Sequence, residues 1–372
     1  MRTINDIPVF HNIPILVRVA LNVPIENGEV ANDYRLREML PTLSYLSKRG
    51  ARVIVISHLG DLGTETLAPV ATALGKHMLN VSFFSETTGE RVRSVIRNML
   101  PGHILVLENL RRNVGEKKND DAFAKELSLL ADVFVQDSFD TCHRAHASIV
   151  GVPKFLPSFA GITLEKEVVE LSRSFSPKRP SLAIIAGAKF ATKKAVLEKL
   201  LRAYDTVFVG GALANDFLKA KGWAVGKSLV SNADDASIRT LLNNPKLLIP
   251  EDVVAVSGNE QRVAAGGVQP DENILDAGPK TTAHLSALVS KAQTILWNGP
   301  LGNYENGFIE ATDTLAHAVA NSKAYSVLGG GDTVAAIEKL GLLNRFTFVS
   351  TGGGAMLDFL AKGTLPGIEA LS

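Results

Sequence analysis

Short apolar runs alternate with segments of helical periodicity along most of the chain, and this alternation limits the possible folds more than any other feature. Residues 52–56 read Arg-Val-Ile-Val-Ile, a run typical of a strand buried on both faces, and residues 67–79 then follow a helical period. Further strands are predicted at 81–84, 103–107, 132–135, 182–186, 205–209, 253–256, 294–297 and 325–328. Strands that alternate with helices form parallel sheets covered on both faces. We therefore expect an α/β fold.

The alternation is interrupted once, near the middle of the chain. Pro153 and Pro157 flank an irregular stretch, a helix is predicted at residues 160–172, and strands resume beyond Pro180. A chain of 372 residues also exceeds what one hydrophobic core usually organises. We expect two Rossmann-like, three-layer domains with a boundary near residues 153–170. The stretch between Val256 and Ile274 shows no period and is predicted to be an irregular surface excursion.

Composition narrows the class of protein. The net charge of +1 gives no general attraction to nucleic acid or to acidic membranes. A single cysteine, Cys142, excludes an internal disulfide framework and suits a reducing compartment. The first twenty residues do not resemble a signal peptide, and no apolar run approaches the length of a membrane span. We expect a cytoplasmic enzyme, with nothing that demands more than a monomer.

Ligands of open parallel sheets bind beyond the carboxyl ends of the strands, so the residues that follow each strand are the candidates for a site. In the first half these positions hold arginines, histidines and amides, whereas in the second half they hold glycine turns and lysines. Guanidinium groups match carboxylates and phosphates, and glycine turns at helix starts suit a phosphate chain. Two anionic substrates, one for each domain, are predicted. The first-half candidates are Asn22, Arg35, His58, Arg111 and Arg144.

The turn at residues 329–333, Gly-Gly-Gly-Asp-Thr, lies between a predicted strand and a predicted helix. Glycines let the main chain bend and approach a ligand, and the free N–H groups at a helix start attract anions. Asp332 could either cap the helix or face a phosphate-bound cation. Lys189 and Lys193 bracket the start of another helix, where their charges oppose the helix dipole unless a phosphate lies between them.

Three other motifs favour structural interpretations. The segment Gly222 to Ser228 resembles a phosphate loop, but it has three residues between its glycines instead of four and follows a helix. His143 and His146 lack partners at zinc-ligand spacing, which favours a phosphate contact or a structural role over a metal site. Cys142 beside His143 has no visible orienting group, so a buried thiol is expected.

Eight short motifs, in this order and spacing, make the chain resemble phosphoglycerate kinases along nearly its whole length. The motifs are Arg18-Val19-Ala20-Leu21-Asn22-Val23-Pro24, Ser57-His58-Leu59-Gly60, Glu108-Asn109-Leu110-Arg111, His143-Arg144-Ala145-His146-Ala147-Ser148, Gly187-Ala188-Lys189, Trp297-Asn298-Gly299-Pro300, Gly329-Gly330-Gly331-Asp332-Thr333 and Ser350-Thr351-Gly352-Gly353-Gly354-Ala355. Each motif alone is weak, and together they are specific.

The resemblance implies a hinge-bending enzyme of glycolysis that exchanges a phosphoryl group between 1,3-bisphosphoglycerate with MgADP and 3-phosphoglycerate with MgATP. It implies a phosphoglycerate-binding domain (residues 1–153 with a tail from about 365 to 372), a hinge helix within 154–172, and a nucleotide-binding domain (173–364). Arg35 and Lys189 would neutralise the transferred group when the cleft closes. The remaining roles by resemblance are Asn22, Arg35, His58, Arg111 and Arg144 for phosphoglycerate, Lys193, Glu305, Gly329, Gly330, Gly331, Asp332 and Thr333 for nucleotide, and Asp332 for Mg2+.

The chain departs from the family pattern at two pocket positions. Ala20 stands where the family has Asp, and Asp61 stands where the family has Arg. Losing a buried carboxylate that accepts a substrate hydroxyl costs on the order of 1–3 kcal/mol in that contact. Arg112, where the family usually has an aromatic residue, is a candidate to restore the charge. Two hypotheses follow: a working phosphoglycerate kinase with a rewired substrate side, or a nucleotide-binding paralogue with little kinase activity and a binding or regulatory role.

Overall fold

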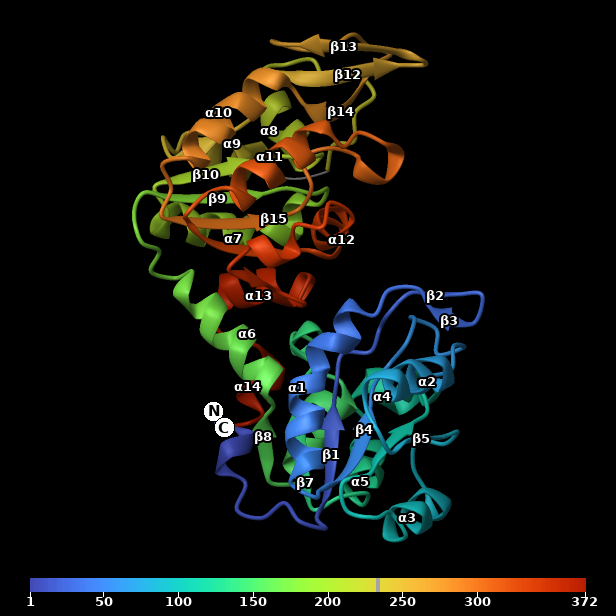
Figure 1. Cartoon of the computed structure of the whole chain (residues 1–372). Helices are drawn as coiled ribbons and strands as arrows, with labels where there is room; N and C mark the ends of the chain where they lie inside the picture. Colours follow the sequence, from blue (N-terminus) through green and yellow to red (C-terminus); the bar gives the residue numbers. More distant parts are fainter. Residues whose placement is uncertain (232–234) are drawn as a thin grey trace. The chain divides into compact units, whose positions relative to one another are not determined.

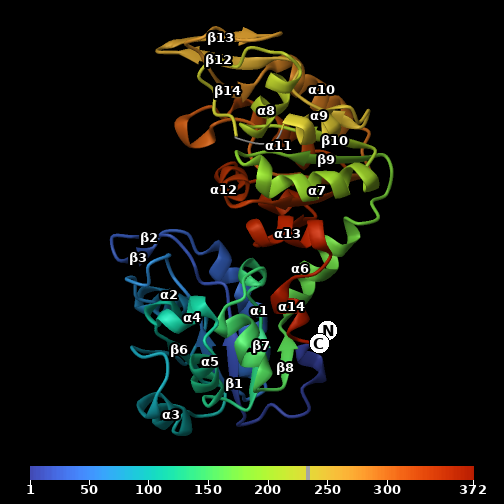
Figure 2. The same cartoon turned by 180° about the vertical axis from the view of Figure 1, so that it is seen from behind.

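The computed structural model describes residues 1–231 and 235–372 of the chain, which divide into two compact units. The first unit comprises residues 1–169 together with 364–372, and the second comprises residues 170–363. Both units contain a six-stranded parallel sheet with helices on its faces, so the predicted α/β class is confirmed (Figures 1 and 2). Within the described residues, no helix combines the length and the apolar character that a membrane span requires.

The sheet of the first unit has the strand order β5-β6-β4-β1-β7-β8, and every neighbouring pair is parallel. Its strands are β1 (Pro14–Arg18), β4 (Arg52–Ile56), β5 (Val81–Phe84), β6 (Ile104–Leu107), β7 (Val133–Gln136) and β8 (Ser158–Ala160). Its helices are α1 (Tyr34–Lys48), α2 (Ala68–His77), α3 (Glu90–Arg97), α4 (Val114–Lys118), α5 (Asp121–Ser128) and α14 (Pro366–Glu369), and β2 (Ile25–Glu26) pairs with β3 (Glu29–Val30) in a small hairpin.

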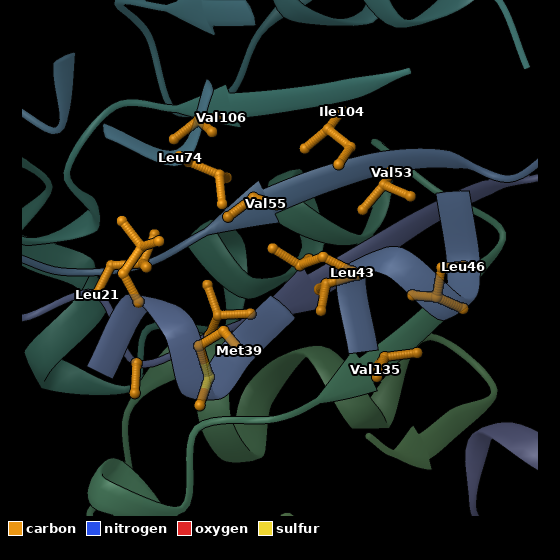
Figure 3. Packing of buried hydrophobic residues seen from close by; sticks show 14 of the residues in the cluster. Leu21, Met39, Leu43, Leu46, Val53, Val55, Leu74, Ile104, Val106 and Val135 are labelled. Carbon is orange, nitrogen blue, oxygen red and sulfur yellow. The ribbon is translucent and has the colours of Figure 1, made fainter. Parts of the chain in front are cut away.

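Side-chain alternation along the strands divides the core of this unit into two layers. On β4, Val53 and Val55 belong to the cluster that includes α1 and α2, whereas Ile54 belongs to the cluster that includes α3 and α5. Figure 3 shows the first layer, with Leu43 of α1 and Leu74 of α2 directed at the strand side chains. Both faces of the sheet are thereby covered, as the continuous apolar strands require.

Helix α6 (Ile162–Arg173) spans the division between the two units, and buried polar groups hold its first turn. The Asp137 carboxylate accepts hydrogen bonds from the main-chain N–H groups of Thr163 and Leu164, at 2.9 and 3.0 Å. Thr42 Oγ1 of α1 accepts another from the N–H of Ile162. Three otherwise orphaned donors at the helix start are thus satisfied from within the first unit.

Residues 364–372 return to the first unit. The N–H of Gly367 donates to the carbonyl of Cys142 at 2.9 Å, and the side chains of Leu365 and Leu371 are buried. The Cys142 thiol is fully buried, and burial raises its pKa well above the usual range. A buried, unreactive thiol agrees with the sequence-based interpretation of this residue.

The sheet of the second unit has the order β11-β10-β9-β15-β16-β17, again parallel throughout. Its strands are β9 (Ser181–Ile185), β10 (Thr206–Val209), β11 (Leu247–Leu248), β15 (Thr294–Asn298), β16 (Tyr325–Gly329) and β17 (Phe348–Val349). Its helices are α7 (Phe190–Ala203), α8 (Leu213–Ala220), α9 (Asp235–Leu242), α10 (Pro279–Val289), α11 (Glu310–Ala320), α12 (Gly331–Lys339) and α13 (Gly354–Lys362).

A second, antiparallel sheet replaces the irregular excursion that was predicted between Val256 and Ile274. It has the order β13-β12-β14, formed by β12 (Val253–Ser257), β13 (Glu260–Ala264) and β14 (Asn273–Ala277). The sequence-based interpretation was wrong here because four of the five residues of β13 are exposed, so the strand lacks an apolar period.

Candidate functional site

Four predicted residues of the first unit follow the carboxyl ends of adjacent strands. Asn22 comes after β1, His58 after β4, Arg111 after β6 and Arg144 after β7, in a sheet ordered β6-β4-β1-β7. Burial is the largest cause that lowers the pKa of His58 and of His146, and the charges of Arg111 and Arg144 lower both further, which places these groups within electrostatic reach of one another. The structure therefore brings the predicted basic residues to one edge of the sheet.

Arg18, which the sequence-based interpretation did not select, organises this cluster. Its side chain is fully buried, and Nη2 lies 2.8 Å from Nδ1 of His58. A guanidinium can only donate, so Nδ1 accepts and the imidazole proton belongs on Nε2. Burial, followed by the charge of Arg18, lowers the pKa of His58 far below its usual value. His58 is thus a neutral donor with a fixed tautomer. The sequence could have indicated this role, because Arg18 directly follows the apolar run Ile-Leu-Val of a predicted strand.

A buried carboxylate balances Arg18. Nε of Arg18 donates to Ser148 Oγ at 3.1 Å, and Ser148 Oγ donates to Oε1 of Glu116 at 2.6 Å. The main-chain N–H of Ser148 donates to the other oxygen of Glu116 at 3.0 Å. Glu116 and Arg18 are both buried, so this relay satisfies two groups that would otherwise be costly to bury.

Asn22 links Arg35 to the loop that follows β4. Its carbonyl accepts from Nη1 of Arg35 at 2.9 Å, and its Oδ1 accepts from the N–H of Gly60 at 3.0 Å. The bond to Oδ1 fixes the orientation of the side-chain amide and leaves Nδ2 as a donor that points elsewhere, whereas the Arg35 bond is made to the main-chain carbonyl. Arg35, at the start of α1, is held beside the cluster by this contact.

The two departures from the family pattern have distinct surroundings. Ala20 is fully buried within the apolar cluster of the first unit. The carboxylate of Asp61 is exposed and lies 2.6 Å from Nη1 of Arg111. Arg112, the candidate to restore the charge, has its Nη1 paired with Glu108 Oε2 at 3.1 Å.

In the second unit, glycine turns and lysines from separate segments line one cavity of about 270 Å³. Its walls include Gly187 and Lys189 from the β9–α7 connection, Lys193 from the first turn of α7, and Gly299 from the turn after β15. Gly330 before α12, together with Asp332 and Thr333 in the first turn of α12, forms another wall. The predicted convergence of these turns is confirmed.

The structure does not support the interpretation of Asp332 as the cap of helix α12. Gly330, with φ of 95°, is the N-cap, and Asp332 is the second helical residue and makes no capping bond with its side chain. Asp332 instead lines the cavity. Thr333 is fully buried, and its Oγ1 accepts from the N–H of Gly299 at 2.8 Å, which ties two glycine turns together.

The pKa of Lys193 reflects the charges that line this cavity. Burial is the largest cause that lowers its pKa, the nearby charge of Lys189 acts in the same direction, and Asp332 raises it. Lys189 is the N-cap residue of α7 and makes no capping bond with its side chain. Two cations face one carboxylate at the starts of two helices, which leaves an excess of positive charge for an anion.

A larger cavity of about 510 Å³ adjoins the first, since both include Gly187, Ala188, Pro300 and Asp332. Glu305 lines it, together with apolar side chains such as Leu218 and Leu301. Gly329 and Gly331 line neither cavity. No cluster of three His, Cys, Asp or Glu side chains suited to a metal ion occurs among the described residues.

The segment Gly222 to Ser228 is a turn and opens no helix, as predicted. The N–H of Lys227 donates to the carbonyl of Glu272 at 2.8 Å, and Ser228 Oγ accepts from the N–H of Ile274 at 2.8 Å. Gly226, with φ of 54°, lies so close to the carbonyl of Glu272 that a Cβ would clash. Lys227 and Ser228 also line the larger cavity.

Comparison with known proteins shows which family the chain belongs to. The family model for phosphoglycerate kinase matches residues 4–363. The chain belongs to the phosphoglycerate kinase family. It is 42% identical to phosphoglycerate kinase from Pelotomaculum thermopropionicum, over 100% of this chain and 98% of that protein. Against a phosphoglycerate kinase from Thermus thermophilus the identity is 44%, with 96% of each chain covered.

Solved structures of the family share the fold. The phosphoglycerate kinase structure from Coxiella burnetii matches with a TM-score of 0.85 and 38% identity, over 99% of this chain and 98% of that one. The Pyrococcus horikoshii structure matches with a TM-score of 0.89 and 31% identity, over 100% and 98%. The predicted two-domain architecture and the predicted activity, transfer of a phosphoryl group to and from a carboxyl group, are confirmed at this level. These matches give no support to the impaired-paralogue hypothesis.

Proposed function

We propose that the chain catalyses reversible phosphoryl transfer between 1,3-bisphosphoglycerate with MgADP and 3-phosphoglycerate with MgATP, and that each unit binds one substrate. The observation that supports this proposal is the cavity of the second unit, which Lys189, Lys193 and Asp332 line together. Beside them, Thr333 accepts a hydrogen bond from Gly299 and so joins two glycine turns. We further propose that the enzyme acts in glycolysis as a cytoplasmic monomer on small-molecule substrates, without a nucleic-acid or membrane partner.

The first unit is proposed to bind phosphoglycerate. Arg111, Arg144 and Arg35 supply the cationic donors, and His58 supplies a neutral N–H whose tautomer Arg18 sets. Asn22 contributes its Nδ2, since its Oδ1 is already used by Gly60. Cations in a partly buried site bind carboxylate and phosphate groups more strongly than surface cations do, because water screens them less.

The second unit is proposed to bind the nucleotide. Gly330, Asp332 and Thr333 at the start of α12 surround the phosphate chain with Lys193. Gly329 and Gly331 flank this turn, and the open space at the Cβ position of Gly331 permits a close backbone approach. Glu305 would accept hydrogen bonds from the ribose hydroxyls in the larger cavity, where apolar walls suit the base.

Mg2+ fits this site as a companion of the nucleotide. Asp332 offers one carboxylate, and two lysines leave no room for a site built from several acidic ligands. A cation held mainly by phosphate oxygens, with few protein ligands, is the arrangement that Mg2+ commonly adopts. When bound, it would neutralise charge on the phosphate chain.

Phosphoryl transfer needs positioning and charge neutralisation more than covalent chemistry. Lys189 and Arg35 are proposed to stabilise the negative charge on the equatorial oxygens of the group in transfer. In the ATP-forming direction the oxygen of ADP attacks an acyl phosphate, the bond to the carboxylate oxygen breaks, and no general base is required. The absence of a nucleophile-and-base pair among the selected residues agrees with this chemistry.

The decisive experiment is a coupled assay in the ATP-consuming direction, with 3-phosphoglycerate varied over a wide range. Turnover that saturates with 3-phosphoglycerate and falls in Lys189→Ala is expected. Calorimetric titration with MgADP runs in parallel. Measurable MgADP binding without turnover above background would refute the proposal and support a nucleotide-binding protein instead.

A further inference from the structure

The buried guanidinium of Arg111 forms hydrogen bonds through only one of its three nitrogen atoms within the part of the chain that the structure describes. Only 2% of its side chain is exposed, and its Nη1 donates both to the carbonyl of Gly60 and to the carboxylate of Asp61. Within the part of the chain that the structure describes, its Nε and Nη2 are buried without a hydrogen-bond partner. A buried guanidinium with two unsatisfied donor atoms is costly unless a ligand or water completes it.

The loop that supplies these contacts is anchored at several points. The N–H of Gly60 donates to Asn22 Oδ1, and Nζ of Lys117 donates to the carbonyl of Asp61 at 2.6 Å. Gly63, with φ of 77°, lies so close to the carbonyl of Arg111 that a Cβ would clash. The backbone of this loop therefore packs directly against the Arg111 segment.

The Asp61 side chain is the movable part of the arrangement. It is 82% exposed, so its carboxylate can rotate into water at little cost while the backbone contacts persist. Burial and the charge of Arg144 lower the pKa of Arg111, and the Asp61 charge acts in the opposite direction. Asp61 thus provides the counter-charge of Arg111 in this state.

We propose that Asp61 is an internal substitute for the substrate anion: its carboxylate occupies Arg111 in the free enzyme and is displaced when a phosphate or carboxylate of the ligand binds. This inference rests on the proposed role of Arg111 in binding phosphoglycerate. Each binding event exchanges one ion pair for another, so affinity is reduced while the protein avoids an unpaired buried guanidinium. Asp61 therefore determines the affinity for the anion.

The test compares Asp61→Asn with the wild type by calorimetric titration of 3-phosphoglycerate and of inorganic sulfate. The amide keeps the size of the side chain and removes the competing charge. The dissociation constants of both anions are expected to fall about two- to fivefold, the range for losing an exposed ion pair. In the kinetic assay, KM for 3-phosphoglycerate should fall by the same factor, with kcat changed less than about twofold.

Glu65→Gln is the matched control, because Glu65 is an exposed acid of the same loop without an ion pair to Arg111. It should shift both dissociation constants less than about twofold. Arg111→Lys should weaken both anions in the wild-type background. Unchanged or weaker anion binding in Asp61→Asn, while Arg111→Lys still weakens it, would overturn the inference. If Arg111→Lys has no effect, the proposed binding role of Arg111 itself is wrong.

Discussion

Oγ1 of Thr333 accepts a hydrogen bond from the main-chain N–H of Gly299 at 2.8 Å, and this bond joins two turns that come from different strands. Thr333→Val keeps the shape but leaves the buried N–H unsatisfied, which costs about 1–3 kcal/mol. We expect MgADP affinity to fall about tenfold or more by calorimetry. Thr333→Ser retains the hydroxyl and should bind within about twofold of the wild type; equal loss in both variants would contradict the role of the bond.

Lys193 should take up a proton when the nucleotide binds. Burial and Lys189 lower its pKa, and an incoming phosphate anion raises it again. Titrations of MgADP at about pH 9, between neutrality and the usual pKa of lysine, should therefore give apparent enthalpies that depend on the ionisation enthalpy of the buffer. Lys193→Met should remove that dependence. A buffer dependence that survives in the variant would assign the proton to another group.

Two neighbouring glycines should respond differently to alanine. A Cβ on Gly329 would lie 2.0 Å from Sδ of the buried Met356, so Gly329→Ala should lower the free energy of unfolding by about 1–3 kcal/mol. Apart from its chain neighbours and the backbone of its own helix, no atom lies within 4 Å of a Cβ on Gly331. Gly331→Ala should leave thermal stability unchanged or raised, because alanine favours a helix, yet weaken MgADP by filling the space beside the phosphate chain. Denaturant unfolding and calorimetry separate the two outcomes.

The cap of helix α6 should make stability depend on pH. Burial raises the pKa of Asp137 to about 7, against 3.8 for an unperturbed carboxyl, although its hydrogen bonds act in the opposite direction. The folded state therefore keeps a proton that the unfolded state loses, so this contribution is complete below about pH 4 and disappears as the pH rises towards 7. Asp137→Asn cannot titrate and can still accept from Thr163 and Leu164.

Relative to the wild type, Asp137→Asn should therefore gain stability as the pH is raised from about 5 to about 8, by at most about 3 kcal/mol. Differential scanning fluorimetry of both proteins at the two pH values measures this difference, and other titrating groups cancel in the comparison. A difference in melting temperature that is the same at both pH values would show that Asp137 has an ordinary pKa.

The sequence predicted the strand framework well where strands are buried on both faces. Val53 to Ile56 and Ile184 lie in continuous apolar runs, and the parallel arrangement then places their following residues at one sheet edge. His58, Arg111 and the turn before α12 could be selected on that basis alone. The exposed strand β13 could not, because its side chains carry no apolar period.

Contacts between segments that are far apart in the chain could not be predicted from the sequence. The pairing of Arg111 with Asp61 joins positions fifty residues apart, and its geometry depends on how the loop after β4 folds back. The expectation that Arg112 restores the lost charge did not take into account that Arg112 pairs with Glu108, four residues before it. The pairing of Arg111 with Asp61 has no local signature such as a turn motif, whereas Glu108 and Arg112 have the i,i+4 spacing but lie outside an α-helix.

The first unit is built from two separate segments of the chain, and this affects how it folds during synthesis. Residues 170–363 form one continuous unit, whereas the first unit requires Leu365 and Gly367, which are synthesised roughly 200 residues after most of it. At about 5–20 residues per second, the segment that covers Cys142 follows after roughly 10–40 s. During that interval a nascent chain exposes the apolar surface that Leu365 and Leu371 later bury. Chaperones that bind hydrophobic segments during translation would therefore meet the first unit while it is incomplete.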